Sequence, residues 1–196
     1  MKIGFDFDNT IIDYSNIFYE IGKINNLIPE NINTSKSSVK SYLHSKGKEK
    51  EFTIIQGLVY GKEILKAKPA KNILEILKYL KKLNHDLYIV SHKTKYPFQG
   101  EKINLRDSAN SWIEKFLRIN NETIFNYANV FYEDTIQKKV ERVEQLEICY
   151  FIDDLISIIN LIKSPTIGIL YDPNYLINKK SPKIINDHLD FKKIIT

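Results

Sequence analysis

Residues 2–12 of the chain read KIGFDFDNTII. A short apolar run with alternating aromatic residues passes directly into two carboxylates and a hydroxyl, those of Asp6, Asp8 and Thr10. Side chains two residues apart lie on the same side of an extended chain, so Asp6 and Asp8 are expected to lie together. Two such charges repel in a low-dielectric pocket unless a metal ion or a shared proton intervenes. The simpler alternative is a strand end followed by a turn in which these side chains only cap the backbone.

Length and composition exclude several classes of protein. A chain of 196 residues with 43% hydrophobic and 27% charged residues predicts a globular domain with room for a modest insertion. The net charge of +5 comes from lysines spread over nearly every segment, which favours small anionic substrates over a nucleic-acid partner. The single cysteine excludes an intramolecular disulfide. Because no run of 18 apolar residues occurs, we expect no membrane partner and a cytoplasmic protein; the oligomeric state stays open.

Hydrophobic periodicity divides the chain into a helical insertion and an alternating part. Apolar residues recur at helical spacing through residues 15–66, with two glycines inside the last predicted helix, over 51–66. From Pro69 onward, predicted helices at 70–84, 107–117, 136–147 and 155–162 alternate with strands at 87–90, 129–132, 148–152 and 166–171. Such alternation predicts an α/β fold with a parallel sheet. Residues 174–196 show no interpretable pattern.

Polar residues follow three of the predicted strands. Asp6 and Asp8 follow the first, Ser91 follows the strand at 87–90, and Asp153 and Asp154 follow the strand at 148–152. Ligands of parallel sheets gather at the carboxyl ends of the strands, so these groups are expected to meet. Four carboxylates in one place require a divalent cation, and hard oxygen ligands without Cys or His select Mg²⁺ over zinc.

A bound Mg²⁺ among carboxylates suits an anionic ligand such as a phosphate, whose other oxygens need a hydroxyl and an ammonium. Ser91 supplies the hydroxyl. Lys138 or Lys139, at a helix start upstream of the Asp pair, supplies the ammonium. His92 and Lys93 follow Ser91, and either could reach a substrate phosphate or sugar; a solvated loop position is the alternative for His92.

The motifs resemble those of the haloacid-dehalogenase (HAD) superfamily of phosphatases. That family carries Asp-x-Asp-x-Thr after its first strand, a Ser or Thr after a second apolar strand, a Lys before a helix, and an acidic pair after another strand. All four are present in this order between residues 2 and about 173. The resemblance implies a Rossmann-like, doubly wound parallel sheet formed by residues 1–14 and 67–196, with a small α-helical cap at residues 15–66.

The resemblance also implies a role for each motif residue. Asp6 would be the nucleophile that forms an aspartyl-phosphate, and Asp8 the acid that protonates the leaving group and then activates water. Thr10 would orient the Asp8 loop. Mg²⁺ would be held by Asp6, the backbone carbonyl of Asp8, Asp153 and, directly or through water, Asp154. Ser91 and a lysine would bind the phosphoryl group, and the family's spacing favours Lys139 over Lys138. Together with Thr10 in the first motif and His92 beside Ser91, the expected phosphate-binding residues are Thr10, Ser91, His92 and Lys139.

The function expected from these residues is Mg²⁺-dependent hydrolysis of a phosphomonoester. The substrate would be a small phosphorylated metabolite, such as a sugar phosphate or a nucleotide. Two alternatives remain at this stage. A phosphotransferase or phosphomutase of the same superfamily would keep the chemistry and exclude water as the acceptor. A nonenzymatic RNA-binding module would use the basic surface, although the dispersed lysines argue against it.

Overall fold

The computed structural model describes residues 1–177 and 183–195, and the chain forms two compact units. The α/β unit contains Met1–Ile12, Pro69–Lys93 and Leu117–Thr196; the helical unit contains Asp13–Lys68 and Thr94–Phe116. Strands β2 (Ile12–Asp13) and β3 (Lys68–Pro69) lie where the chain passes from one unit to the other. The helical unit thus takes in residues 94–116 besides the predicted insertion, and the boundary at 15–66 stays a prediction.

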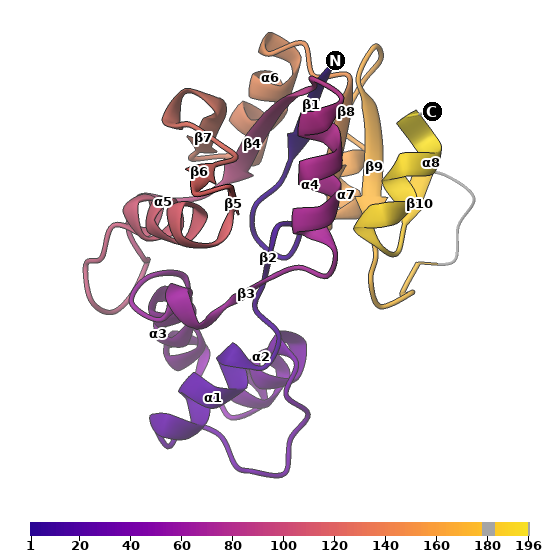
Figure 1. The fold of residues 1–196 in the computed structure, drawn as a ribbon. Helices are drawn as coiled ribbons and strands as arrows, with labels where there is room; N and C mark the ends of the chain where they lie inside the picture. Colours follow the sequence, from indigo (N-terminus) through magenta and orange to yellow (C-terminus); the bar gives the residue numbers. More distant parts are fainter. Residues whose placement is uncertain (178–182, 196) are drawn as a thin grey trace. The chain divides into compact units, whose positions relative to one another are not determined.

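A six-stranded sheet in the order β10-β9-β8-β1-β4-β7 forms the centre of the α/β unit (Figure 1). Every neighbouring pair is parallel, with β1 between β4 and β8. The predicted Rossmann-like α/β fold is therefore confirmed. The strands of this sheet are β1 (Lys2–Phe5), β4 (Asp86–His92), β7 (Val130–Glu133), β8 (Tyr150–Asp153), β9 (Ile167–Tyr171) and β10 (Lys183–Ile185).

The sequence of β1 suits a central position. Ile3 and Phe5 are almost completely buried, as is Phe7 just beyond the strand. Gly4 faces the neighbouring strand β8, and a Cβ atom on it would lie only 2.9 Å from Cδ2 of Phe151. Glycine therefore lets the Phe151 ring pack directly against the β1 backbone.

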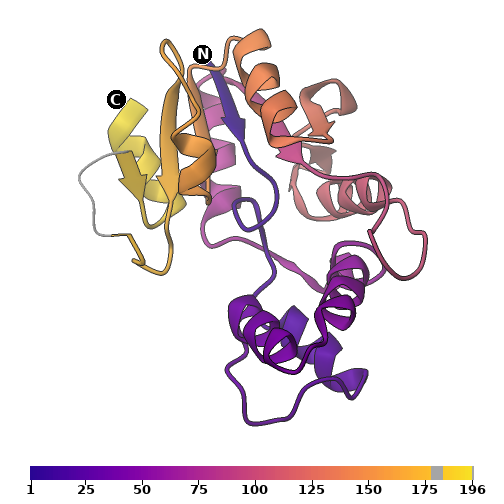
Figure 2. The ribbon, with the colours of Figure 1, turned by 180° about the vertical axis from the view of Figure 1, so that it is seen from behind.

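Helices cover both faces of the sheet. Helix α4 (Ile73–Lys82) lies in front of the strands in Figure 1 and behind them in Figure 2, where α6 (Ile136–Gln145) and α7 (Ile156–Ile159) come to the front. Buried residues recur at helical spacing along α4, and Val143 of α6 packs in a core cluster with Val90 and Phe151. The remaining elements of the unit are β5 (Arg118–Ile119), β6 (Glu122–Thr123), η2 (Tyr127–Asn129), η3 (His188–Phe191) and α8 (Lys192–Ile195).

The tail of the chain adds structure that periodicity did not predict. Strand β10 extends the sheet beside β9, and the short 3-10 helix η3 and α8 follow it. A capping box at Asp187 and Asp190 begins η3. Residues 178–182 and 196 of this tail lie outside the described residues.

The helical unit consists of α1 (Ile17–Ile24), α2 (Lys36–Ser45), α3 (Glu49–Tyr60), η1 (Ile64–Lys66) and α5 (Leu105–Phe116). The predicted helix over 51–66 is shorter in the structure, because α3 ends at Tyr60, Gly61 is its C-cap, and the chain turns into η1. Phe18 stacks on Phe52 at 5.9 Å, and the Trp112 indole N–H donates to the Ala67 carbonyl over 2.9 Å. Among the described residues, no helix combines the length and the hydropathy needed to span a membrane.

Candidate active site

The chain forms a tight turn directly after β1. The Asp6 N–H donates to the Ile152 carbonyl at 2.8 Å, which continues the pairing with β8 beyond the end of the strand. The N–H groups of Ile11 and Ile12 both donate to the Phe7 carbonyl, at 3.0 and 3.1 Å. Asn9 takes φ of 61°, a left-handed conformation that asparagine tolerates better than most residues. Asp6 is therefore held by the sheet, whereas Asp8 and Thr10 are held by the turn.

Lys139 connects the first strand to the acidic pair after β8. Its ammonium donates to Oδ1 of Asp6 at 2.5 Å and to Oδ2 of Asp153 at 2.6 Å. The three side chains are 3%, 7% and 0% exposed. One carboxylate oxygen each of Asp6, Asp153 and Asp154 lie within 4.8 Å of one another. Helix α6 and the ends of two adjacent strands thus bring the predicted acidic groups together.

The environment of the cluster raises the pKa values of two of its carboxyl groups, Asp6 and Asp154. Burial raises the pKa of Asp6 to about 7 against the lowering effect of Lys139, and Asp153 and Asp8 raise it further. Burial, followed by the charges of Asp6 and Asp153, raises the pKa of Asp154 to about 8. Although burial acts to lower the pKa of Lys139, Asp6 and Asp153 together raise it above its usual value. Lys139 therefore stays positively charged beside three clustered carboxyl groups. One ammonium cannot neutralise all three as carboxylates, so a bound cation would be favourable here.

Ser91 is buried at the end of β4, beside β1. Its side chain is almost fully inaccessible, and its hydroxyl has no hydrogen-bond partner within the described part of the chain. Buried hydroxyls nearly always have a partner, and leaving one unpaired costs about 1–3 kcal/mol. Such a group is typical of a site that binds a polar ligand.

Thr10 contacts the loop that follows β8. Its Oγ1 accepts a hydrogen bond from the N–H of Asp154 at 3.1 Å, and its side chain is fully buried. The side chain of Asp153 accepts in turn from the Leu155 N–H at 2.8 Å. The threonine therefore ties the turn after β1 to the acidic pair, which fixes the direction of the Asp154 backbone.

His92 and Lys93 occupy different environments. His92 is exposed, and its Nε2 lies 3.1 Å from the carbonyl oxygen of Asp134. The Lys93 side chain is 2% exposed, and its ammonium lies 3.0 and 2.9 Å from the two carboxylate oxygens of Asp8. Lys93 is thus a second buried lysine at the same edge of the sheet. The assignment of His92 to a substrate phosphate stays a prediction.

Comparisons with known proteins rest on structure, since no protein-family model and no curated protein sequence matches the chain. A HAD family hydrolase from Deinococcus radiodurans R1, with bound phosphate and sodium, matches at 10% identity and a TM-score of 0.63, over 99% of this chain and 94% of that one. A HAD phosphatase from Thermococcus onnurineus matches at 15% identity and a TM-score of 0.57, over 100% and 98%. The Bacillus subtilis protein YfnB, bound to magnesium, matches at 14% identity and a TM-score of 0.60, over 100% and 98%.

The fold is that of the HAD-superfamily hydrolases. Within this HAD-like fold, Asp6, Lys139 and Asp153 of three predicted motifs meet in the buried cluster, and Ser91 of the remaining motif is buried near the end of β4, the strand beside β1. Lys139 is the buried lysine of the pair considered from the sequence, whereas Lys138 is exposed. The sequence contains a signal for this choice, because Lys139 precedes the buried Val143 by four residues and so shares its helix face.

The residues fit a hard divalent cation. Each of the three clustered side chains offers carboxylate oxygen, the donor that Mg²⁺ prefers. The raised pKa values of Asp6 and Asp154 follow first from burial and then from neighbouring negative charges that a cation would offset. Asp6, Asp153 and Asp154 are thus the side chains suited to hold the ion.

His188 is a site neighbour that sequence reasoning missed. It begins η3, is completely buried, and its Nε2 lies 2.8 Å from the Thr10 carbonyl oxygen. The two residues are separated by 178 positions in the chain. Its segment showed neither helix nor strand periodicity, so no sequence signal connected it to the turn after β1.

Proposed function

We propose that the protein is a Mg²⁺-dependent, HAD-type phosphomonoester hydrolase that acts on a small phosphorylated metabolite of the cytoplasm. The observation that carries the proposal is the buried cluster in which Lys139 donates to both Asp6 and Asp153, beside Asp154. A buried surplus of carboxyl groups is costly to the fold, so a role in binding or catalysis accounts for it better than a structural one. The HAD-like fold, shared with a hydrolase that has bound phosphate, supports the same chemistry.

Asp6 is the proposed nucleophile. A carboxylate oxygen of Asp6 attacks the phosphorus of the substrate, the bond from phosphorus to the leaving oxygen breaks, and an aspartyl-phosphate forms. Lys139 holds the Asp6 side chain through Oδ1 and stays positively charged beside the transferred group. Its charge would offset the negative charge that develops on the phosphoryl oxygens.

Asp8 is the proposed acid and base. In its protonated form it gives a proton to the leaving oxygen; the resulting carboxylate then takes a proton from the water that attacks the aspartyl-phosphate. Phosphate is released, and both Asp6 and Asp8 return to their starting states. Lys93, which contacts both oxygens of Asp8, orients this carboxylate.

Ser91 and the metal complete the proposed site. The buried hydroxyl of Ser91 has no partner among the described residues and would donate to a phosphoryl oxygen. Asp6, the backbone carbonyl of Asp8, Asp153 and Asp154 would hold Mg²⁺, which when bound supplies positive charge to the phosphoryl oxygens. Thr10 acts indirectly, by fixing the backbone of Asp154.

Hydrolysis of p-nitrophenyl phosphate in the presence of Mg²⁺ tests the proposal. We expect turnover by the wild type, and a loss of roughly 10³-fold or more in Asp6→Asn, which should still unfold cooperatively in a thermal melt. Asp86→Asn is the matched control, because Asp86 is an exposed carboxylate at the first position of β4, the neighbouring strand. Turnover in Asp6→Asn equal to that of the control would refute Asp6 as the nucleophile. A wild type inactive on a broad panel of phosphate esters would refute the function.

A further inference from the structure

The turn that carries Asp8 and Thr10 is held from the far end of the chain. His188 Nε2 lies 2.8 Å from the Thr10 carbonyl oxygen, and the His188 side chain is completely buried. A carbonyl oxygen can only accept, so the shared proton belongs to His188. The imidazole therefore donates to the backbone of the turn from the side of η3.

The protonation state of the His188 imidazole supports its role as the hydrogen-bond donor. Burial lowers the pKa of His188 to about 4, so the ring is neutral near neutral pH and carries its one proton on Nε2. The other nitrogen, Nδ1, is buried and has no hydrogen-bond partner among the described residues. An unpaired buried acceptor costs free energy that an apolar side chain of similar shape would avoid. The hydrogen bond to Thr10 is the contact that distinguishes histidine from such a side chain.

His188 is itself firmly placed. Its ring stacks on Tyr171 at a centroid distance of 4.2 Å. The preceding residue, Asp187, accepts from the Asn72 side chain at 2.8 and 3.0 Å and caps η3 through the Leu189 N–H. The end of β9, the start of α4 and η3 thus hold the ring in one position.

The contact continues into the proposed metal site. The Thr10 whose carbonyl accepts from His188 uses its hydroxyl to accept from the Asp154 N–H at 3.1 Å. One residue therefore connects η3 to the acidic pair, so a shift of Thr10 would act on the backbone N–H of Asp154. Asp8 lies two residues earlier in the same turn.

We propose that His188 is a positioning residue for the active site, which holds the turn of Asp8 and Thr10 through a hydrogen bond from its Nε2 to the Thr10 carbonyl. The proposal rests on the proposed function for its catalytic consequence. Its structural consequence, the placement of Asp154, can be measured without turnover.

Three variants test it. His188→Leu removes the donor. His188→Gln keeps it, because the glutamine Nε2 is separated from its Cα by the same number of bonds as the imidazole Nε2. Phe191→Leu is the matched control: Phe191 is as buried as His188 in η3, and its ring packs edge-on against Tyr150 at 5.6 Å.

We expect His188→Leu to lower kcat for p-nitrophenyl phosphate about 10-fold or more, with KM within about twofold of the wild type. The Mg²⁺ midpoint, which is the Mg²⁺ concentration that gives half of the rise in melting temperature, should increase about 10-fold or more. His188→Gln should recover most of both. Phe191→Leu should lower the melting temperature and leave kcat and the Mg²⁺ midpoint within about twofold of the wild type.

Equal defects in His188→Leu and Phe191→Leu would overturn the proposal, as would a glutamine variant no better than the leucine variant. If the wild type binds Mg²⁺ without hydrolysing phosphate esters, the proposed function fails, and the Mg²⁺ midpoints alone decide the role of His188. A wild type that neither turns over nor responds to Mg²⁺ would overturn both proposals.

Discussion

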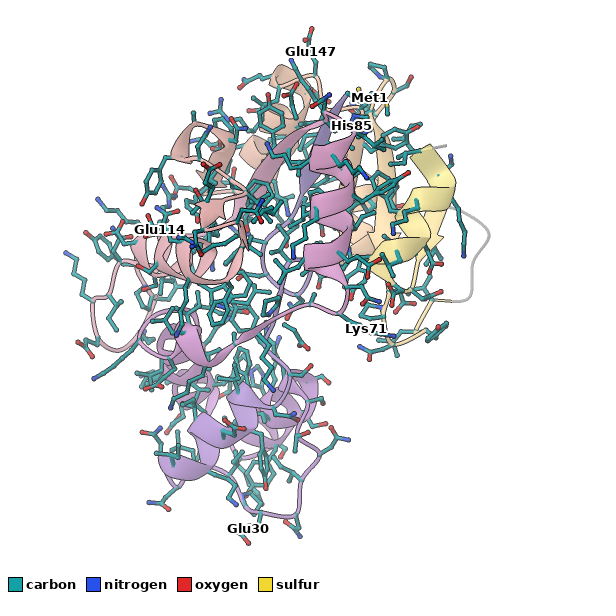
Figure 3. The ribbon with its side chains drawn as sticks, viewed as in Figure 1. Met1, Glu30, Lys71, His85, Glu114 and Glu147 are labelled. Carbon is teal, nitrogen blue, oxygen red and sulfur yellow. The ribbon has the colours of Figure 1, made fainter. Side chains whose placement is uncertain are left out.

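The central sheet carries charged residues along two edges, one where its parallel strands begin and one where they end. The charged residues are exposed at the first edge and buried at the second. At the edge where β1 begins, Met1, His85 and Glu147 lie at the surface (Figure 3). Lys2 pairs with Glu147 at 3.2 Å there, and these side chains are 38% and 83% exposed. At the edge where β1 ends, Lys139 pairs with Asp6 and Asp153, and none of the three side chains is more than 7% exposed.

The difference lies in what each pair costs the folded state. An exposed pair such as Lys2 and Glu147 keeps most of its hydration and contributes about 0–1 kcal/mol to stability. Buried ions lose their hydration, and their mutual attraction repays the loss only with good geometry and matched charge. At the second edge the carboxyl groups outnumber the ammonium groups, because Asp154 adds to the carboxyl groups that Lys93 and Lys139 already pair with. Such an arrangement supports the proposal of a ligand site at this edge.

Lys139→Met should have the largest effect. Removing the ammonium leaves Asp6 and Asp153 buried without their partner, which we expect to lower the free energy of unfolding by about 3–5 kcal/mol and kcat by roughly 10³-fold. Urea unfolding and steady-state kinetics measure the two losses. Lys138→Met, at the exposed neighbouring position, is the control. Equal losses of stability and kcat in the two variants would show that the buried Lys139 matters no more than its exposed neighbour.

Ser91→Ala should separate function from stability. Without the hydroxyl that would hold a phosphoryl oxygen, kcat should fall by about 10²-fold. Stability should stay the same or rise, because the variant removes a buried polar atom that has no partner in the described chain. Thermal unfolding and kinetics on the same preparation provide the test. A clear fall in melting temperature would show instead that the hydroxyl serves the fold.

The metal-free protein should lose stability as the pH rises from about 4 to about 8. The raised pKa values of Asp6, about 7, and Asp154, about 8, mean that the folded state binds more protons than the unfolded state over this range. Mg²⁺ binds the deprotonated carboxylates, so its stabilising effect should grow over the same range. Melting temperatures in EDTA and in Mg²⁺ at pH 5 and pH 8 measure this, at about 2–4 °C per kcal/mol. An equal Mg²⁺ effect at both pH values would contradict it.

The smallest effect is expected at the opposite edge. Lys2→Met and Glu147→Gln remove one exposed ion pair, and each should change the free energy of unfolding by less than about 1 kcal/mol without altering kcat. The same urea and kinetic measurements apply. A loss of activity in either variant would show that the two edges are coupled.

Much of the α/β unit could be predicted because its signals are local. Apolar runs identified the strands, and parallel pairing then required Asp6, Ser91 and Asp153 to gather at one edge. The choice of Lys139 agrees with the helix face that it shares with Val143. These inferences need only the order of elements along the chain.

The missed features depend on contacts between distant residues. The sequence makes Lys93 a candidate phosphate contact, but it does not predict the pairing of Lys93 with Asp8, across 85 positions. His188 lies in a 3-10 helix of four residues, too short to produce a periodic pattern. The shortening of the predicted helix over 51–66 has a local cause, since Gly61 ends α3. For the distant contacts, only the assembled fold shows which polar residues meet.

The position of β1 also has a consequence for biosynthesis. This strand pairs with residues 86–89 on one side and with residues 150–152 on the other. At a ribosomal rate of about 5–20 residues per second, its second neighbour is made roughly 7–30 s after β1 itself. Until then one edge of a strand rich in buried apolar residues is exposed to other chains. The segment that carries Asp6 therefore completes its pairing only after residues 150–152 have been synthesised.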